Sequence, residues 1–417
     1  MLKNYICALD IGSSKIAACV AQTQKKSITN IFFESAPLKG IKRGTIVDSI
    51  GLSGSISRLL KNLKAKSGIN IKFIYTNLSG QDITTKHSRS IIPLAERGNK
   101  VITLSDIQKV NEQGRVLGSS LEEEIIHQIP YSYTIDSSAN IINPLGLYSH
   151  RLEVDLYLVC GRLSSIQTLT RVVNQAGFQI KDLYFTGLAT SKAIYNEELK
   201  EGINILCDIG SDITELLVFK DGRLKDIRIL ALGGDDLTLE ISQKLNIPFD
   251  LAEDVKRSYA SIGDYTRIPE DKEILVKKSN FYKPIKQKWV CELTTSKTMS
   301  MCNAIKDTVQ DLVPTDKINN FITSGRTVLL EGFIEMLENS LGISVRLARI
   351  MNPEMVSVVS KHPDLCGQKY LSYITALGII CQAASDEQPQ LISSYQPTHN
   401  PLIKAINKVK ETYQEYF

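Results

Sequence analysis

A short stretch that occurs twice constrains the fold more than any other feature of this chain. Residues 6–15 read ICALDIGSSK, and residues 205–212 read ILCDIGSD. In each copy an apolar run ends in Asp-Ile-Gly-Ser and apolar residues soon resume, a pattern typical of strand, tight turn and strand. Glycine permits the tight turn, and exposed turn amides form an anion-binding nest. Two such turns, in two related domains, can hold one polyphosphate from opposite sides.

Length and composition exclude several classes of protein. A chain of 417 residues exceeds the size of a single core, so two or more domains are expected. The net charge of +4 is small and no basic stripe is present, so we expect no nucleic-acid partner. The eight cysteines include no CxxC pair, which favours buried thiols in a reducing cytoplasm. We expect no signal peptide and, without roughly 18 consecutive apolar residues, only peripheral contact with a membrane.

Helices and strands alternate along the body of the chain, which predicts an α/β fold. Helices are expected over 49–67, 249–259 and 294–312, and a lysine-rich hairpin over 271–288. Residues 81–162 form an inserted unit, in which Ser105 followed by Gln108 predicts a capping box at a helix start.

The last residues have the pattern of an amphipathic helix behind a linker. Residues 385–399 have the composition of a linker, and residues 400–417 follow it. At about 100° per residue, the apolar and aromatic side chains of this segment share one face and its charged side chains gather opposite. Partial immersion of that face in a lipid bilayer contributes about 5–8 kcal/mol of binding free energy before the cost of ordering the helix is subtracted, so a single copy binds lipid marginally. A polymer that presents many copies binds by avidity. The alternative is a helix that docks on protein. The predicted membrane-binding residues are Leu402, Ile403, Lys404, Ile406, Val409, Tyr413, Tyr416 and Phe417.

The paired turns predict a nucleotide site. We expect the amides of Gly12, Ser13 and Ser14 to bind the terminal phosphates, with Lys15 as countercharge. Asp10 and Asp208 would orient a hydrated Mg²⁺, which keeps most of its waters when one or two carboxylates bind it. The helix with Glu253 and Lys256 and the loop at Gly325 would contact the purine. The full predicted cofactor-binding set is Asp10, Gly12, Ser13, Ser14, Lys15, Asp208, Gly210, Ser211, Asp212, Gly233, Gly234, Glu253, Lys256, Ser324, Gly325 and Arg326.

These motifs resemble those of the actin-like ATPases, and within them those of the FtsA family of bacterial cell-division proteins. Asp10 to Lys15 is similar to the first phosphate motif, and Asp208-Ile209-Gly210 opens the second. Three further matches are particular to the FtsA family. They are Ile129-Pro130-x-x-Tyr133-x-Ile135-Asp136 with Asn143-Pro144-x-Gly146-Leu147, the segment Gly187-Leu188-Ala189-Thr190-Ser191, and the C-terminal helix. Two other segments resemble the wider group of actin-like ATPases: Ala252-Glu253-x-x-Lys256 is similar to the purine-side helix, and Ile322-Thr323-Ser324-Gly325 to the adenosine loop.

The resemblance implies a duplicated actin/Hsp70-like ATPase fold, with two domains around a nucleotide cleft, an inserted 1C subdomain and a C-terminal amphipathic helix. It implies the following boundaries: subdomain 1A over 1–80 and 163–200, the 1C insert over 81–162, subdomain 2A over 201–240 and 294–384, subdomain 2B over 241–293, the linker over 385–399 and the membrane helix over 400–417.

The same resemblance implies a cell-division scaffold that binds ATP and Mg²⁺ and polymerises with itself. Such a protein tethers filaments of the tubulin-like protein FtsZ to membrane lipid by binding the FtsZ C-terminal peptide. Other division proteins are recruited through the 1C subdomain. The implied location is the cytoplasmic side of the bacterial inner membrane at the division site, as a peripheral membrane protein of the septum.

The sequence departs from the family pattern inside the site. In the second phosphate motif Ser211, Asp212 and Ile213 replace two glycines and a threonine, and Glu215 replaces an aspartate. A carboxylate at Asp212 near phosphates costs several kcal/mol unless a metal intervenes. The adenosine loop has one glycine, Gly325, between Ser324 and Arg326. We therefore expect altered nucleotide binding and at most a weak ATPase, and no catalytic residue is assigned.

Three other functions remain open at this point. A sugar kinase or phosphatase of the same superfamily would need a catalytic base and a polar substrate pocket. A chaperone of the Hsp70 kind would need a large β-rich domain after the ATPase, where only about thirty residues follow. A divergent FtsA paralogue with a degenerate nucleotide site would serve as an adaptor.

Overall fold

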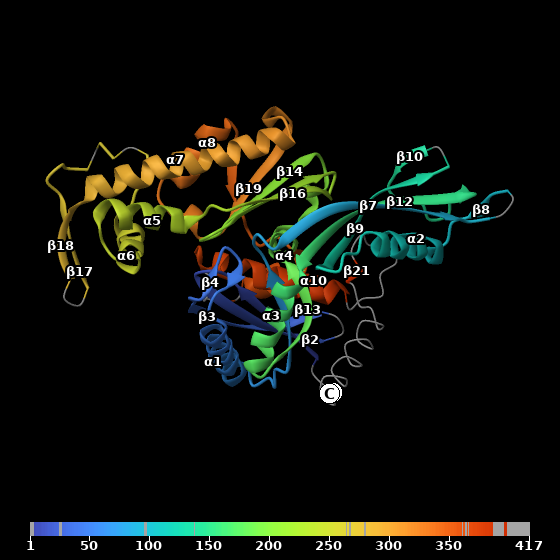
Figure 1. Ribbon diagram of the computed structural model, residues 1–417, viewed down its shortest axis with the longest axis horizontal. Helices are drawn as coiled ribbons and strands as arrows, with labels where there is room; N and C mark the ends of the chain where they lie inside the picture. The colour runs from blue at the N-terminus through green and yellow to red at the C-terminus, as the bar shows by residue number, and fades with distance from the viewer. Residues whose placement is uncertain are drawn as a thin grey trace. The chain divides into compact units, whose positions relative to one another are not determined.

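The computed structural model divides into two compact units, each described here by itself. It describes residues 4–24, 27–95, 98–136, 138–263, 265–266, 268–278, 281–360, 362, 365, 367–386 and 396–397. Residues up to 84 and from 162 to 386 form the larger unit, and residues 85–161 form the smaller one (Figure 1). The predicted membrane helix, with all of its predicted lipid-binding residues, lies outside the described residues.

The first half of the larger unit is built on a five-stranded sheet in the order β13-β6-β1-β2-β3. Its centre is the first Asp-Ile-Gly-Ser copy: β1 and β2 pair antiparallel with Ile11 opposite Ile16, and the turn lies between them. Strands β6 and β13 run parallel to β1, so their carboxyl ends lie at the same edge as this turn. The strands are β1 (Asn4–Ile11), β2 (Lys15–Gln24), β3 (Ser27–Pro37), β6 (Phe73–Leu78) and β13 (Gln179–Phe185).

The second half repeats this arrangement. Its sheet has the order β16-β15-β14-β19-β20, and β14 pairs antiparallel with β15 and parallel with β19, as β1 does with β2 and β6. The second Asp-Ile-Gly-Ser copy is the turn between β14 and β15. The predicted duplication is therefore confirmed strand by strand. The strands are β14 (Ile203–Ile209), β15 (Thr214–Lys220), β16 (Arg223–Leu230), β19 (Ile318–Ser324) and β20 (Val345–Leu347).

Helices cover both faces of the first sheet, and Figure 1 shows α1 and α10 on either side of it. Helix α1 begins after Asp48, whose side chain accepts from the Gly51 amide. Its leucines and Ile56 are buried as predicted, whereas Ile50, at the start of the predicted stripe, is 83% exposed. Helix α10 packs on α4, where Gly378 lies against the backbone of Ala189. The helices are α1 (Ser49–Ser67), α3 (Leu163–Gln175), α4 (Thr186–Ile194), α9 (Pro353–Val359) and α10 (Ile374–Asp386).

Helices of the second half pack around α7. This helix begins at Gln287, seven positions before the predicted start at Thr294, because Val290 and Cys291 continue the buried face directly from the hairpin. The predicted lysine-rich hairpin is present as β17 and β18. The elements are α5 (Gly234–Leu245), α6 (Phe249–Tyr259), β17 (Glu273–Lys278), β18 (Phe281–Lys286), α7 (Gln287–Leu312) and α8 (Phe333–Leu341).

Within its described residues, the smaller unit has a five-stranded sheet, in which β10, β9, β12 and β7 lie in that order and β21 also pairs with β9, and one helix, α2. The capping box at the start of α2 is formed by Thr103 and Asp106, so the prediction of Ser105 and Gln108 was wrong by two residues. Asp106 also pairs with Lys100 (3.1 Å), which favours the earlier start. The elements are β7 (Ile83–Pro93), β8 (Lys100–Val101), α2 (Leu104–Leu117), β9 (Glu123–Ile135), β10 (Ser138–Ile141), β11 (Tyr148–Ser149), β12 (Arg151–Arg162) and β21 (Gln396–Pro397).

Candidate functional site

A cavity of about 460 Å³ lies inside the larger unit, between the turns of the two Asp-Ile-Gly-Ser copies. Its lining includes every residue of the predicted cofactor-binding set except Gly233. Gly233 lies just behind the cavity, where a side chain would meet the backbone of Ser211. Residues from positions 10 to 375 of the chain thus converge on one space that neither half could form alone.

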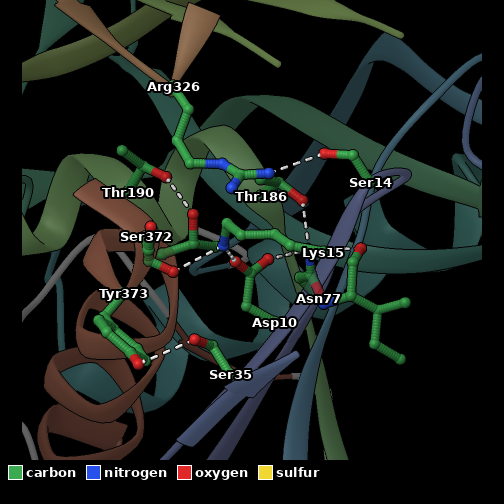
Figure 2. A network of polar contacts seen from close by, with 12 residues as sticks. Asp10, Ser14, Lys15, Ser35, Asn77, Thr186, Thr190, Arg326, Ser372 and Tyr373 are labelled. Carbon is green, nitrogen blue, oxygen red and sulfur yellow. Dashed lines mark hydrogen bonds and ion pairs between the residues drawn. The ribbon is translucent and has the colours of Figure 1, made fainter. Parts of the chain in front are cut away.

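Asp10 and Lys15 form the centre of the first phosphate loop (Figure 2). Lys15 Nζ lies 2.7 Å from Asp10 Oδ2 and donates to the Ser372 carbonyl at 2.6 Å. Asp10 is only 5% exposed, and its other oxygen accepts from Asn77 (3.0 Å). Because each Asp10 oxygen already has a partner, this carboxylate is held in one orientation toward the cavity.

Asn77 is a site residue that the sequence patterns did not single out. It is 3% exposed at the end of β6, and its Oδ1 accepts from the Ile11 amide at 2.7 Å. Its Nδ2 donates both to Asp10 and to the Thr186 hydroxyl (2.9 Å). A lone asparagine in an apolar strand was the available signal, since a buried amide must find hydrogen-bond partners.

The turn amides are not all available to a ligand. Gly12 donates to the Lys15 carbonyl (3.0 Å) and Gly210 donates to the Ile213 carbonyl (2.9 Å), closing the two turns. The turn itself thus uses the Gly12 donor, and the predicted contact of this amide with a phosphate stays a prediction. Within the described part of the chain, the amides of Ser13 and Ser14 have no hydrogen-bond partner, so the predicted nest is reduced to these two donors.

Asp212 does not stand free in the cavity. Its carboxylate accepts from the Arg43 amide at 2.8 Å, across the cavity in the first half. It also shares a hydrogen bond with Asp235, and burial together with the Asp212 charge raises the pKa of Asp235. Asp212 of the second loop and Asp235 of the first turn of α5 thus lie close together at the cavity.

Two further carboxyl groups lie at the base of the cavity. Burial, with the charge of Asp10 beside it, raises the pKa of Asp208 to about 6. Burial also raises the pKa of Glu215 to about 8, against the opposing effect of the Ser79 hydroxyl, which donates to Glu215 at 2.5 Å. Both carboxyl groups are thus harder to ionise than a carboxyl group in water, and Glu215 more so than Asp208.

The predicted purine-side helix contributes a buried ion pair. Lys256 is 6% exposed and lies 2.6 Å from Glu253, while burial lowers its pKa. Its Nζ also donates to the Gly234 carbonyl (2.8 Å) and the Thr238 hydroxyl (2.7 Å). The lysine thereby joins α6 to the first turn of α5. Glu253 also forms an ion pair with Arg257 at 2.6 Å.

The predicted adenosine loop follows β19. Gly325 has φ +91, a conformation that favours glycine, and a side chain there would meet the backbone of Ile209. The next residue, Arg326, extends into the cavity and donates from Nη2 to the Ser14 hydroxyl at 3.0 Å (Figure 2). Burial lowers the pKa of its guanidinium.

Neither a preformed metal centre nor a membrane span is found in the part of the chain that the structure describes. There, no three His, Cys, Asp or Glu side chains are grouped so as to hold a metal ion. Every described helix is too short or too polar to cross a bilayer.

Comparison with known families identifies relatives of the whole chain. The model described as "Cell division protein FtsA" matches residues 205–361, and the model "SHS2 domain inserted in FTSA" matches residues 80–160. The curated protein "Cell division protein FtsA" of Borreliella burgdorferi is 25% identical over 415 residues, covering 98% of this chain and 96% of the relative. Its counterpart in Escherichia coli is 21% identical over 388 residues, covering 91% and 90%.

Comparison with solved structures shows the fold. A chain of a "PilM-PilN type IV pilus biogenesis complex" superposes with a TM-score of 0.62 at 15% identity, covering 91% of this chain and 98% of that chain. The ethanolamine utilization protein EutJ from Carboxydothermus hydrogenoformans gives a TM-score of 0.51 at 16% identity, covering 91% and 90%. The predicted actin-like ATPase fold is thereby confirmed.

Proposed function

Because the chain belongs to the FtsA family of cell-division proteins, we propose that it is a nucleotide-binding, polymerising division scaffold that tethers FtsZ filaments to the cytoplasmic membrane. The observation that carries the nucleotide part is the convergence of both Asp-Ile-Gly-Ser turns on one cavity, whose lining includes Lys15. The membrane and FtsZ parts rest on the sequence of residues 400–417 and on the family.

The residues present fit a nucleotide and Mg²⁺. The amides of Ser13 and Ser14 have no partner among the described residues, and the Lys15 ammonium supplies countercharge beside them. Asp10 and Asp208 would orient a hydrated Mg²⁺, which would neutralise phosphate charge close to Asp212. Glu253, Lys256 and the Gly325 loop would hold the purine side. Because the second phosphate motif and the adenosine loop are altered, hydrolysis is expected to be slow at most.

Calorimetric titration with ATP and Mg²⁺ tests the nucleotide site. We expect saturable binding by the full-length chain, and Lys15→Ala should weaken it about tenfold or more, because a charged hydrogen bond to phosphate is lost. Lys61→Ala, on the exposed face of α1, is the matched control and should bind as the wild type does. Absence of binding at millimolar ATP in the wild type would refute the nucleotide part.

Co-sedimentation with anionic vesicles tests the tether. Deletion of residues 400–417 should abolish sedimentation with the vesicles, both of the protein and of FtsZ filaments added with it. Ile406→Asp, on the predicted apolar face, should weaken sedimentation, and Glu411→Gln, on the opposite face, should leave it unchanged or slightly stronger. Unchanged sedimentation of the truncated chain would refute the tether.

A further inference from the structure

Three side chains of the second half reach across the cavity to the first half. Arg326 donates to the Ser14 hydroxyl at 3.0 Å, and Asp212 accepts from the Arg43 amide at 2.8 Å. Glu215 accepts from the Ser79 hydroxyl at 2.5 Å. These contacts lie at three separate points of the cavity lining, which includes two of the first-half partners, Ser14 and Ser79. Together they join the two halves through protein atoms alone.

The same three residues depart from the family pattern. Asp212 and Arg326 stand where the pattern has glycine, which has no side chain to extend across a cavity. Glu215 stands where the pattern has aspartate, which is one methylene shorter than glutamate. Each departure therefore supplies the atoms that make a contact between the halves, and reversal of each would remove that contact.

Arg326 occupies a position suited to an anion. Its guanidinium reaches Ser14, beside the partnerless Ser13 and Ser14 amides. In the part of the chain that the structure describes, no carboxylate lies within ion-pairing distance of it. A half-buried cation at that point lies where a bound phosphate would otherwise connect the two loops.

We propose that Asp212, Glu215 and Arg326 form a clasp that holds the two halves of the cleft closed without nucleotide, in the place of a bound polyphosphate. The proposal rests on the proposed function, because it takes the same cavity as the nucleotide site. A nucleotide must displace the Arg326 guanidinium from Ser14 before its phosphates can reach the first loop. The cleft is thus closed with or without nucleotide, and a nucleotide competes only with the contact between Arg326 and Ser14.

Distance measurements between spin labels on the two halves test the clasp. Lys61 in α1 and Lys244 in α5 are exposed and belong to opposite halves, so cysteines introduced there carry the labels. The native cysteines within the described residues are buried, and Cys366, outside them, is replaced by serine. Without nucleotide, the wild-type background should give a narrow distance distribution that ATP with Mg²⁺ leaves unchanged.

The pattern-restoring variant Asp212→Gly/Glu215→Asp/Arg326→Gly should give a broader, longer distribution without nucleotide, which ATP with Mg²⁺ shortens. Ser79→Ala removes the contact with Glu215 from the side of the first half, and it should broaden the distance distribution in part. This variant is used in place of the triple variant if the triple variant folds poorly. A broad wild-type distribution that narrows with ATP would overturn the proposal. Wild-type and variant distributions that coincide without nucleotide would also overturn it.

Affinity separates failure of the clasp from failure of the proposed function. Arg326→Gly should bind ATP with Mg²⁺ at least about fivefold more tightly than the wild type, because no hydrogen bond to Ser14 has to be broken. Weaker binding by this variant would make Arg326 a phosphate ligand and overturn its role in the clasp. If neither the wild type nor the triple variant binds ATP, the nucleotide site fails, while the distances still decide the clasp.

Discussion

Asn77→Ala is expected to destabilise the larger unit strongly, because three hydrogen bonds of the first phosphate loop converge on one buried amide. The change leaves the Ile11 amide without its side-chain acceptor and takes one donor from the Asp10 carboxylate. A buried donor left unsatisfied costs about 1–3 kcal/mol, and a hydrogen bond to a charged group contributes about 1.5–3 kcal/mol. Since these contributions overlap within one network, we expect a loss of about 3–5 kcal/mol in the free energy of unfolding.

Urea unfolding followed by tryptophan fluorescence measures this loss. The chain has a single tryptophan, Trp289, and it lies in α7 of the same unit, so its signal reports on that unit. Asn62→Ala, at an exposed position of α1, is the matched control and should change stability by less than about 0.5 kcal/mol. Hydrogen exchange of the Ile11 amide should also accelerate in Asn77→Ala. A midpoint shift no larger than that of the control would show that Asn77 does not hold the loop.

Three more predictions follow from buried groups and close packing in the same unit. Burial raises the pKa of Glu215 to about 8 from an unfolded value of 4.5, so the folded state binds this proton more tightly than the unfolded state does. As the pH rises from about 4.5 to 8, the wild type should therefore lose stability relative to Glu215→Gln, which urea unfolding midpoints measure. A difference in urea midpoint between the wild type and Glu215→Gln that stayed constant with pH would contradict the raised pKa. Gly378→Ala should cost about 1–3 kcal/mol in thermal unfolding because its methyl group meets the backbone of α4, whereas Gly54→Ala, which faces open space in α1, should gain about 0.5–1 kcal/mol. Equal effects at the two glycines would exclude that contact. Lys256→Ala should lower the free energy of unfolding by about 2–3 kcal/mol, because it leaves Glu253 partly unpaired. In a double-mutant cycle, Lys256→Ala and Glu253→Ala together should lower it by less than the sum of the two single effects.

Most secondary structure was predictable because it depends on local spacing. The apolar stripe of α1 and the alternation in β14 and β15 are periodic patterns within single segments, and both elements are present where the patterns indicate. Helix starts were less predictable. Two capping patterns overlap near residue 104, and the structure shows that Thr103 and Asp106 form the capping box while Asp106 also pairs with Lys100.

The candidate site was predictable as a set of residues but not as an arrangement. The motifs named the residues that line the cavity, since each motif is a short segment with its own turn. Their partners were hidden, because the Gly12 amide turns back on the loop and Asp10 and Lys15 bind each other. Asn77 lies outside every motif and acts only through residues brought to it by the sheet.

The sequence by itself determined the duplicated strand-turn-strand unit, because a repeated motif between apolar runs needs only local chain geometry. It also marked Asp212, Glu215 and Arg326 as departures from the family pattern. Only the tertiary structure decided what these departures do. Arg326 and Ser14 are 312 positions apart, and their contact exists because two sheets of the same topology face each other across one cavity. No periodicity along the chain encodes which side chains meet there, since that depends on how the two halves pack.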